Sequence, residues 1–258
     1  MQCRPLRLGM VLFLFAAAMA TGQVDLRLDI ATSTVLTHEP LTARVTVVNN
    51  GALPLAVNAA DGSGPQLYFG VEHDSGVSAV RREGGALPAF MVPPGRVETV
   101  EVDLTMRFVL TQSGSYFVRA LLDGGGVEAR SSLKVIDVVP GIELIRTSGN
   151  VPYAPGVRRT YSLRYWGRQR RDHVFLCVSD APSGRTFAPI HLGTLMRVVR
   201  PTMSAGDDGV VTVKHQVNRS QMMVSTLKSR RSRLSLVSQR PVRTSSAPMP
   251  KPPTLPRK

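Results

Sequence analysis

The sequence predicts an all-β protein made of two consecutive β-domains. Over many short stretches, apolar and polar residues alternate with a period of two, which is the pattern of strands that bury one face. The 22 glycines and 19 prolines among 258 residues favour many turns and few long helices. The hydrophobic content of 43% is enough for a packed core, so we do not expect a chain that is disordered throughout.

The first 22 residues have the pattern of a cleavable export signal. Arg4 and Arg7 precede a short apolar run at residues 10–20, and small residues follow it, which places cleavage after Ala20 or Gly22. The apolar run is shorter than the roughly 20 residues that a membrane-spanning helix needs. We therefore expect a secreted or periplasmic protein that has no transmembrane anchor once the signal is removed.

Cysteine usage supports the same compartment. Signal removal takes Cys3 away and leaves Cys177 as the single cysteine, so no intramolecular disulfide can form. An exported chain without disulfides depends on its apolar core, which favours a bacterial envelope protein over a small disulfide-stapled domain.

Residues 23–139 are predicted to form an antiparallel sandwich. Period-two stretches are separated by turn-formers such as Asn49-Asn50-Gly51, Pro93-Pro94-Gly95 and the glycines that follow Asp123. The stretches lie at 24–30, 41–47, 99–104, 116–122 and 127–135.

A local motif indicates which kind of sandwich this is. Leu110-Thr111-Gln112-Ser113-Gly114-Ser115 leads into Tyr116, which begins an alternating stretch. This motif resembles the tyrosine corner of immunoglobulin-like domains, in which the tyrosine hydroxyl bonds to nearby backbone. The resemblance, to bacterial extracytoplasmic immunoglobulin-like domains, covers residues 24–139 and implies a structural role for Tyr116 and a binding, spacing or scaffold function. Val118 stands where antibody domains carry a cysteine, so the antibody disulfide is not expected.

Residues 140–240 are predicted to form a second, basic β-domain. Pro140-Gly141 marks the boundary, and alternation resumes at 161–165, 174–178 and 209–217. Asn218-Arg219-Ser220 is predicted to be a hairpin turn before a further strand at 221–227. Whether this domain is a second copy of the first fold stays open. The Pro-rich basic segment 241–258 is predicted to be a disordered tail.

No catalytic or metal-binding motif is present, so we predict no catalytic, cofactor or metal residues. Asp207-Asp208-Gly209 is expected to be a turn, and Cys177 a buried inert thiol on an alternating strand. Metal binding would require ligands from separate strands, so the histidines are expected to be isolated. They are His38, His73, His173, His191 and His215.

Charge divides the chain in two. Residues 24–139 hold 9 Lys and Arg against 13 Asp and Glu, whereas residues 140–258 hold 21 against 5. Two basic clusters are candidate anion-binding sites in the second half. One cluster is Arg168, Arg170 and Arg171, and the other is Lys228, Arg230, Arg231 and Arg233.

The export signal disfavours nucleic acid as the partner of these clusters. It favours an anionic glycan, a lipid or an envelope protein, and a merely solvated basic surface is the alternative. The sequence thus favours an exported, non-enzymatic binding or scaffold protein of the cell envelope. Two alternatives stay open, a hydrolase acting on an envelope polymer at the domain junction and a secreted peptidase inhibitor that uses the Pro93-Pro94 loop.

Overall fold

The computed structural model describes residues 23–243 except 84–86, 153, 169 and 232. Strands make up the regular structure of this part, apart from one short 3-10 helix, η1 (Leu104–Met106), so the all-β prediction is confirmed. The expected signal segment 1–22 and the tail beyond residue 243 lie outside the described residues. The part of the chain that is described contains no helix that could span a lipid bilayer.

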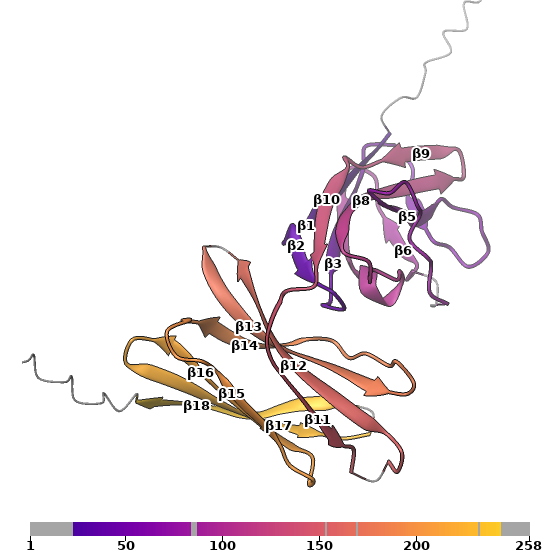
Figure 1. Cartoon of the computed structure of the whole chain (residues 1–258). Coiled ribbons are helices and arrows are strands. Elements are labelled where there is room, and N and C mark those ends of the chain that lie inside the picture. The colour runs from indigo at the N-terminus through magenta and orange to yellow at the C-terminus, as the bar shows by residue number, and fades with distance from the viewer. Residues whose placement is uncertain (1–22, 84–86, 153, 169, 232, 244–258) are drawn as a thin grey trace, which may run out of the picture.

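The first unit is a sandwich of two main sheets (Figure 1). One sheet has the order β1-β3-β7 and the other β2-β10-β8-β5, with β9 paired to β8 and a small β4-β6 ribbon beside them. The strands are β1 (Val24–Ile30), β2 (Thr34–Leu36), β3 (Thr42–Asn49), β4 (Leu55–Val57), β5 (Gln66–His73), β6 (Phe90–Val92), β7 (Val97–Asp103), β8 (Gly114–Gly124), β9 (Val127–Arg130) and β10 (Lys134–Val139).

The strand order of this unit is that of an immunoglobulin-like domain. The first sheet joins the strands in the A, B and E positions, and the second joins those in the C, F and G positions. The short strand β2 leaves the first sheet and pairs in parallel with β10, while β10 and β5 both pair antiparallel with the central β8. Pairing on both sides fixes β8 in the centre of its sheet, where its inward residues meet the core.

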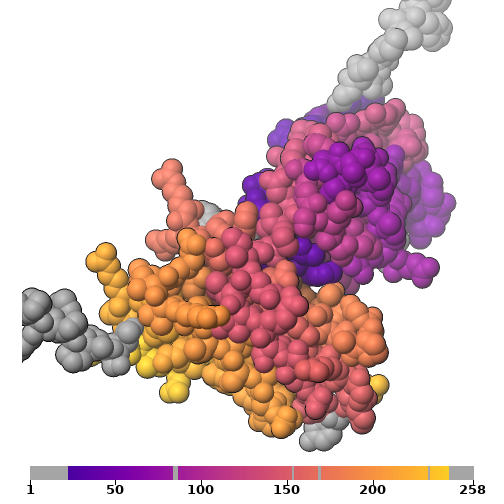
Figure 2. All heavy atoms as spheres, in the orientation of Figure 1, coloured from indigo at the N-terminus to yellow at the C-terminus, as the bar shows by residue number. Residues whose placement is uncertain are grey.

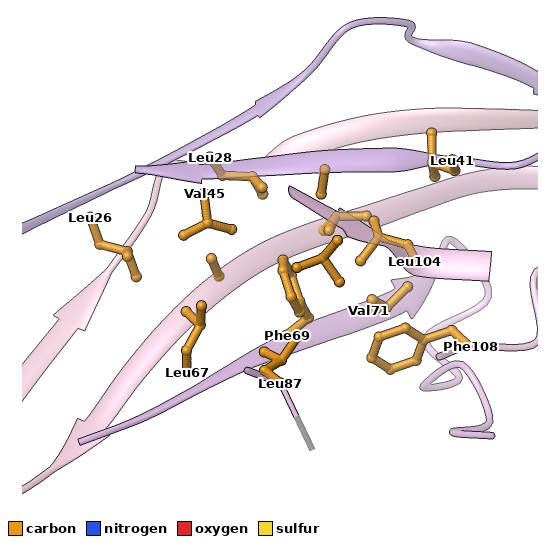
Figure 3. Packing of buried hydrophobic residues seen from close by; sticks show 14 of the residues in the cluster. Leu26, Leu28, Leu41, Val45, Leu67, Phe69, Val71, Leu87, Leu104 and Phe108 are labelled. Atoms are coloured by element: carbon orange, nitrogen blue, oxygen red, sulfur yellow. The ribbon is translucent and has the colours of Figure 1, made fainter. Parts of the chain in front are cut away.

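Alternating apolar residues fill the space between these sheets (Figure 3). Leu26 and Leu28 from β1 and Val45 from β3 face Leu67 and Phe69 from β5, and each is at most 4% exposed. Burying an aliphatic or aromatic side chain of this size contributes roughly 1.5–3 kcal/mol, so such a layer supports the fold without disulfides.

The last predicted stretch of this unit, 127–135, is wrong as one continuous strand. The chain breaks after β9, and the Ser131 hydroxyl accepts the Ala120 N–H before β10 begins. The break changes which residues face inward, so Val135 is 47% exposed, whereas Ile136 and Val138 enter the core.

The second unit packs two four-stranded antiparallel sheets face to face, β11-β12-β13-β14 and β15-β16-β17-β18. Each sheet is a meander in chain order, so this unit is not a copy of the immunoglobulin-like unit. The predicted hairpin between β16 and β17 is confirmed. The strands are β11 (Ile142–Asn150), β12 (Arg158–Arg168), β13 (Arg171–Ala181), β14 (Ile190–Leu195), β15 (Thr202–Ala205), β16 (Val210–Asn218), β17 (Gln221–Ser229) and β18 (Leu234–Arg243).

Strand β18 runs three residues past the predicted start of the disordered tail. Pro241 pairs with Met223, and Val242 and Arg243 continue the ladder. β18 lies at the edge of its sheet, and an edge strand tolerates proline because one side of its backbone needs no ladder hydrogen bonds. The composition at Pro241 therefore does not end the strand.

The two units lie against one another in the space-filling view (Figure 2). Pro140 and Gly141 join them, between the end of β10 and the start of β11. Gly141 has a φ of 67°, and a Cβ there would lie 2.8 Å from a methyl group of Leu36, so glycine is required. The Arg164 guanidinium donates to the Pro140 carbonyl at 2.8 Å. The Arg164 bond ties the connection to the outer face of the second unit, and the Leu36 contact holds it against the first.

Candidate functional site

The two predicted basic clusters lie at opposite ends of the second sandwich. Arg170 and Arg171 are at the β12–β13 turn, whereas Arg230 is at the β17–β18 turn. The Arg230 carbonyl accepts a hydrogen bond from Arg159 at the beginning of β12, nine residues from the end of that strand. At about 3.3 Å per residue the two turns are roughly 30 Å apart, so the clusters are separate surfaces.

The β12–β13 turn carries its cations into solvent. Arg170 and Arg171 are both exposed, and Arg170 has a φ of 62°, the left-handed conformation that closes the turn. The side chain of Arg168, the third member of the predicted cluster, lies outside the described part of the chain.

Backbone pairing brings further cations to the same end. Asp172, next to the turn, pairs with Leu195 at the end of β14, and the loop that follows β14 hydrogen-bonds to Gln216. The β16–β17 turn comes next, where Gln221 pairs with Arg243. We call the exposed cations gathered here the basic end. They are Arg170, Arg171, Arg197, Arg200, Arg219 and Arg243.

A single carboxylate among the described residues accompanies this surface. Asp172 accepts from the Arg197 guanidinium at 2.7 Å, so it neutralises one cation and leaves the others in excess. Of the other carboxylates in the unit, Asp180 is buried, Asp207 and Asp208 lie at the far end, and Glu143 is engaged in ion pairs of its own. The basic end is therefore a region of strong positive potential.

The loop after β14 also exposes apolar side chains between two arginines. Val198 is 78% exposed and Val199 is 39% exposed. The loop is held firmly, because Met196 N–H donates to the Gln216 carbonyl at 2.7 Å and Arg197 donates to the Tyr165 hydroxyl at 2.9 Å. Because the loop is anchored in this conformation, the two valines stay exposed after folding. A partner that covers them would gain the free energy of burying their apolar surface.

The opposite end mixes both signs of charge. A cavity of about 860 Å³ is lined by Asp207 and Asp208 together with Lys228, Arg230 and Arg231. Asp208 caps the turn by accepting the Val210 N–H at 2.9 Å, which is the turn role predicted for this carboxylate pair. The nearby carboxylates reduce the positive potential of the second predicted cluster, so it is the weaker of the two candidates.

A buried ion pair organises that end. Arg159 is fully buried, and its guanidinium donates to both carboxylate oxygens of Asp180 at 2.6 and 2.8 Å. It also donates to the Ser229 hydroxyl and the Arg230 carbonyl, both at 2.7 Å, and its charge lies 4.5 Å from the centre of the Phe187 ring. The arginine therefore links the β12–β13 hairpin to the β17–β18 turn and plays a structural role.

The junction between the units contains a cavity of about 430 Å³, and Cys177 lines it together with His38 and Arg164. Cys177 is less buried than predicted, because Val174, Leu176 and Val178 take the inward positions of β13 and leave the thiol half-buried on the outer face. Burial nevertheless raises the pKa of the thiol to about 11, so it stays protonated near neutral pH and is a poor nucleophile.

One kind of hydrolase uses convergent carboxylates, and at the junction these would line the cavity. None of the described residues lining the cavity is a carboxylate. The nearby Glu143 accepts from Arg146 at 2.7 Å and from Ser162 at 2.7 Å, and these bonds, Arg146 first, lower its pKa. An ionised carboxylate engaged in this way is not available as a general acid.

The prediction that the histidines are isolated is wrong for one pair. His173 Nδ1 lies 2.9 Å from His191 Nε2, because strands β13 and β14 are neighbours. His215 lies in the interior, and neither ring nitrogen has a hydrogen bond of good geometry among the described residues, although the Thr194 backbone is near. Burial lowers the pKa of His215 to about 4, with His191 as a further cause, so the ring is neutral near pH 7.

Tyr116 has the contacts expected of a tyrosine corner. Its side chain is 3% exposed, and its hydroxyl donates to the Gln112 carbonyl at 3.2 Å. The His73 ring packs edge-on against the Tyr116 ring, with 4.9 Å between the two ring centroids. The Pro93-Pro94 loop, the candidate inhibitor loop, forms a tight turn in which Arg96 N–H donates to the Pro93 carbonyl at 3.1 Å and Gly95 N–H to the Asn49 carbonyl at 2.8 Å.

Comparisons with known proteins identify no family for this chain. No protein-family model matches the chain, and no curated protein matches it. Solved structures with some likeness include the Pseudomonas fluorescens alkylpurine DNA glycosylase AlkC bound to DNA, with 15% identity, 46% of this chain and 31% of that chain covered, and a TM-score of 0.32.

Two further solved structures have some likeness to this chain. The CARDB domain of a Pyrococcus furiosus protein, in complex with di-metal ions, is 15% identical over 45% of this chain and 87% of that chain, with a TM-score of 0.29. The sporulation control protein Spo0M from Bacillus subtilis is 11% identical over 67% and 91%, also with a TM-score of 0.29. At these scores no property of the three proteins is carried over to this chain.

Proposed function

We propose that this protein is an exported, non-enzymatic binding or scaffold protein of the cell envelope that docks through its basic end on an anionic lipid surface. One observation carries the proposal: six exposed cations converge on one end of the second sandwich, against one carboxylate that is already paired. Clusters of four to eight such cations are typical of surfaces that contact anionic head groups.

The exposed valines favour a lipid surface over a soluble glycan. Val198, at 78% exposure, projects from a loop between Arg197 and Arg200. At a bilayer surface the arginines would contact head groups while the valine leaves water. Electrostatic attraction and apolar burial would then both contribute to binding. A hydrated polysaccharide offers no apolar phase, so it would use the arginines alone.

The immunoglobulin-like unit has a different part in this proposal. Its acidic balance gives it no attraction to an anionic surface, so it would project from the surface as a spacer or as a binding face for another envelope protein. This arrangement agrees with the resemblance of residues 24–139 to extracytoplasmic immunoglobulin-like domains.

Export itself has a direct test. N-terminal sequencing of protein recovered from outside the cytoplasm should begin at Thr21 or Gln23, because the signal pattern places cleavage before these residues. Recovery of chains that still carry Met1 from the membrane fraction would contradict the export assignment.

Lipid and glycan binding can be separated with one exposed valine. Val198→Ser should weaken co-sedimentation with anionic phospholipid vesicles at least several-fold and leave heparin binding unchanged. Val77→Ser is the matched control, since Val77 is 63% exposed in the first unit. Equal loss of both ligands in Val198→Ser, or equal binding of neutral and anionic vesicles by the unaltered protein, would refute lipid docking.

A further inference from the structure

The His173–His191 pair lies on the outer face of the β11–β14 sheet, away from the sandwich core. The two rings have centroids 5.1 Å apart and are inclined at 41°. The Phe175 ring, which is 1% exposed, packs 5.0 Å from His191 and limits the positions that this imidazole can take. The two nitrogens that face one another are therefore held by the fold and not merely by flexible surface chains.

A β-bulge creates this pair. Val174 pairs with Gly193 and the next residue, Phe175, pairs with His191, so Leu192 is the extra residue in β14. Gly193 has a φ of 111°, a conformation that favours glycine. In a regular ladder His191 would face the interior, but the one-residue shift moves it to the outer face beside His173.

We propose that His173 and His191 form a two-ligand site for a divalent transition-metal ion, with Cu(II) as the best fit. Two imidazole nitrogens bound at about 2.0 Å and at right angles lie roughly 2.9 Å apart, whereas tetrahedral ligands lie about 3.3 Å apart. The 2.9 Å between His173 Nδ1 and His191 Nε2 is the length of the hydrogen bond that joins the two rings. It is also close to the right-angled separation that Cu(II) and Ni(II) prefer, so such an ion could replace the shared proton with little movement of the rings.

Solvent would complete the coordination. Among the described residues, no group of three or more His, Cys, Asp or Glu side chains is arranged to hold a metal. His191 is exposed, so an ion reaches the pair directly from water. Cu(II) forms the strongest complexes of the divalent first-row ions, and imidazole is among its preferred ligands, so two nitrogens select it over Zn(II).

The single tryptophan provides the readout. Trp166 in β12 is paired directly with His173 in β13 and lies on the same outer face. Directly opposed residues have Cβ atoms about 5 Å apart. Cu(II) is a quencher of indole fluorescence at short range, so an ion on His173 should quench the Trp166 emission.

The experiment is a titration of the full chain with CuCl₂, followed by Trp166 emission and by the nitrogen couplings in the Cu(II) electron paramagnetic resonance spectrum. We expect saturable quenching at one equivalent and two coordinated nitrogens. His191→Gln, which keeps a hydrogen-bonding side chain, should bind at least tenfold more weakly. His38→Asn should behave as the unaltered protein, since asparagine tolerates the φ of 68° at that position.

Two outcomes would overturn the metal site. One is quenching that is identical in His191→Gln and the unaltered protein, which would place the ion elsewhere, such as on the chain's terminal amine. The other is the absence of saturable quenching in the unaltered protein, which would leave the pair as a hydrogen bond between two neutral imidazoles. Circular dichroism of His191→Gln confirms that the variant is folded in either case.

Discussion

Replacing Asp180 by alanine should destabilise the second sandwich strongly. The carboxylate is 5% exposed and accepts two hydrogen bonds from Arg159, whose side chain is fully buried. In Asp180→Ala the guanidinium keeps its bonds to Ser229 and to the Arg230 carbonyl, but its charge remains in the interior without a counter-ion.

The magnitude follows from the burial of both groups. Removing one partner of a buried ion pair costs about 3–5 kcal/mol, because the other charge is left uncompensated. The retained bonds from Arg159 place the expected loss at the lower end, about 3 kcal/mol. For a sandwich of this size each kcal/mol lowers Tm by roughly 4–8 °C, so Tm should fall by about 12–24 °C.

Trp166 makes the measurement specific to this unit. It is the only tryptophan of the chain and lies in β12, so its fluorescence follows unfolding of the second sandwich. Glu143→Ala is the matched control in the same unit, because Glu143 forms a 2.7 Å ion pair with Arg146 at the surface, and such a pair contributes under about 1 kcal/mol.

The double variant Arg159→Met with Asp180→Leu tests the reasoning independently. Replacing both charges by apolar groups removes the uncompensated charge, so the double variant should be more stable than Asp180→Ala alone. A Tm for Asp180→Ala within about 3 °C of the unaltered protein would refute the argument. A double variant less stable than the single one would do so as well.

Two further stability predictions concern single side chains. Tyr116→Phe should destabilise the first unit by about 1 kcal/mol, because it loses the hydrogen bond to the Gln112 carbonyl. The unfolding transition followed by Trp166 fluorescence should not move, and an unchanged Tm of the first unit would contradict the tyrosine corner. His215, with its pKa lowered from 6.5 to about 4, should make stability fall as pH decreases from 6.5 to 4, since only the unfolded chain gains the proton there. The loss amounts to about 3 kcal/mol at pH 4 and should be absent from His215→Met; an equal pH slope in that variant would show that other groups cause it.

Period-two alternation predicted most of the fold because burial on one face leaves a direct trace in the sequence. The same alternation also indicates the buried ion pair, because Arg159 shares the inward positions of β12 with Tyr161 and Leu163. An arginine at an inward position indicates a buried partner, and Asp180, in step with Val178, is that partner. The alternation of inward and outward positions could therefore have predicted the Arg159–Asp180 pair. Charge alone predicts that both side chains lie in solvent.

The basic end and the histidine pair were beyond reach for a different reason. The cations of the basic end come from separate hairpins, and the order in which two sheets meet is not encoded in local alternation. His173 and His191 lie on neighbouring strands of one sheet, and the bulge in β14 puts them on the same face. The bulge in β14 shifts the register by one residue, and a single Gly193 in the sequence does not specify a bulge. Arg197-Val198-Val199-Arg200 was the one local signal of the basic end, since exposed valines between arginines are unusual in a loop.

The most direct test of the proposed docking compares equal charge removal at the two ends of the second sandwich. Each variant loses three positive charges, so net charge is matched. The basic-end variant combines Arg170→Asn, Arg171→Gln and Arg200→Gln, and the opposite-end variant combines Arg230→Gln, Arg231→Gln and Arg233→Gln. Affinity for anionic phospholipid vesicles is measured for both at low and at physiological salt, where the Debye length is about 8 Å.

At about 1 kcal/mol per cation near the surface, the basic-end variant should lose roughly 100-fold in affinity at low salt. The opposite-end variant should bind within a few-fold of the unaltered protein, and binding of all three proteins should weaken as salt rises. Equal losses in the two variants would show that net charge alone drives binding, and a larger loss at the opposite end would place the docking surface there; either result contradicts the account.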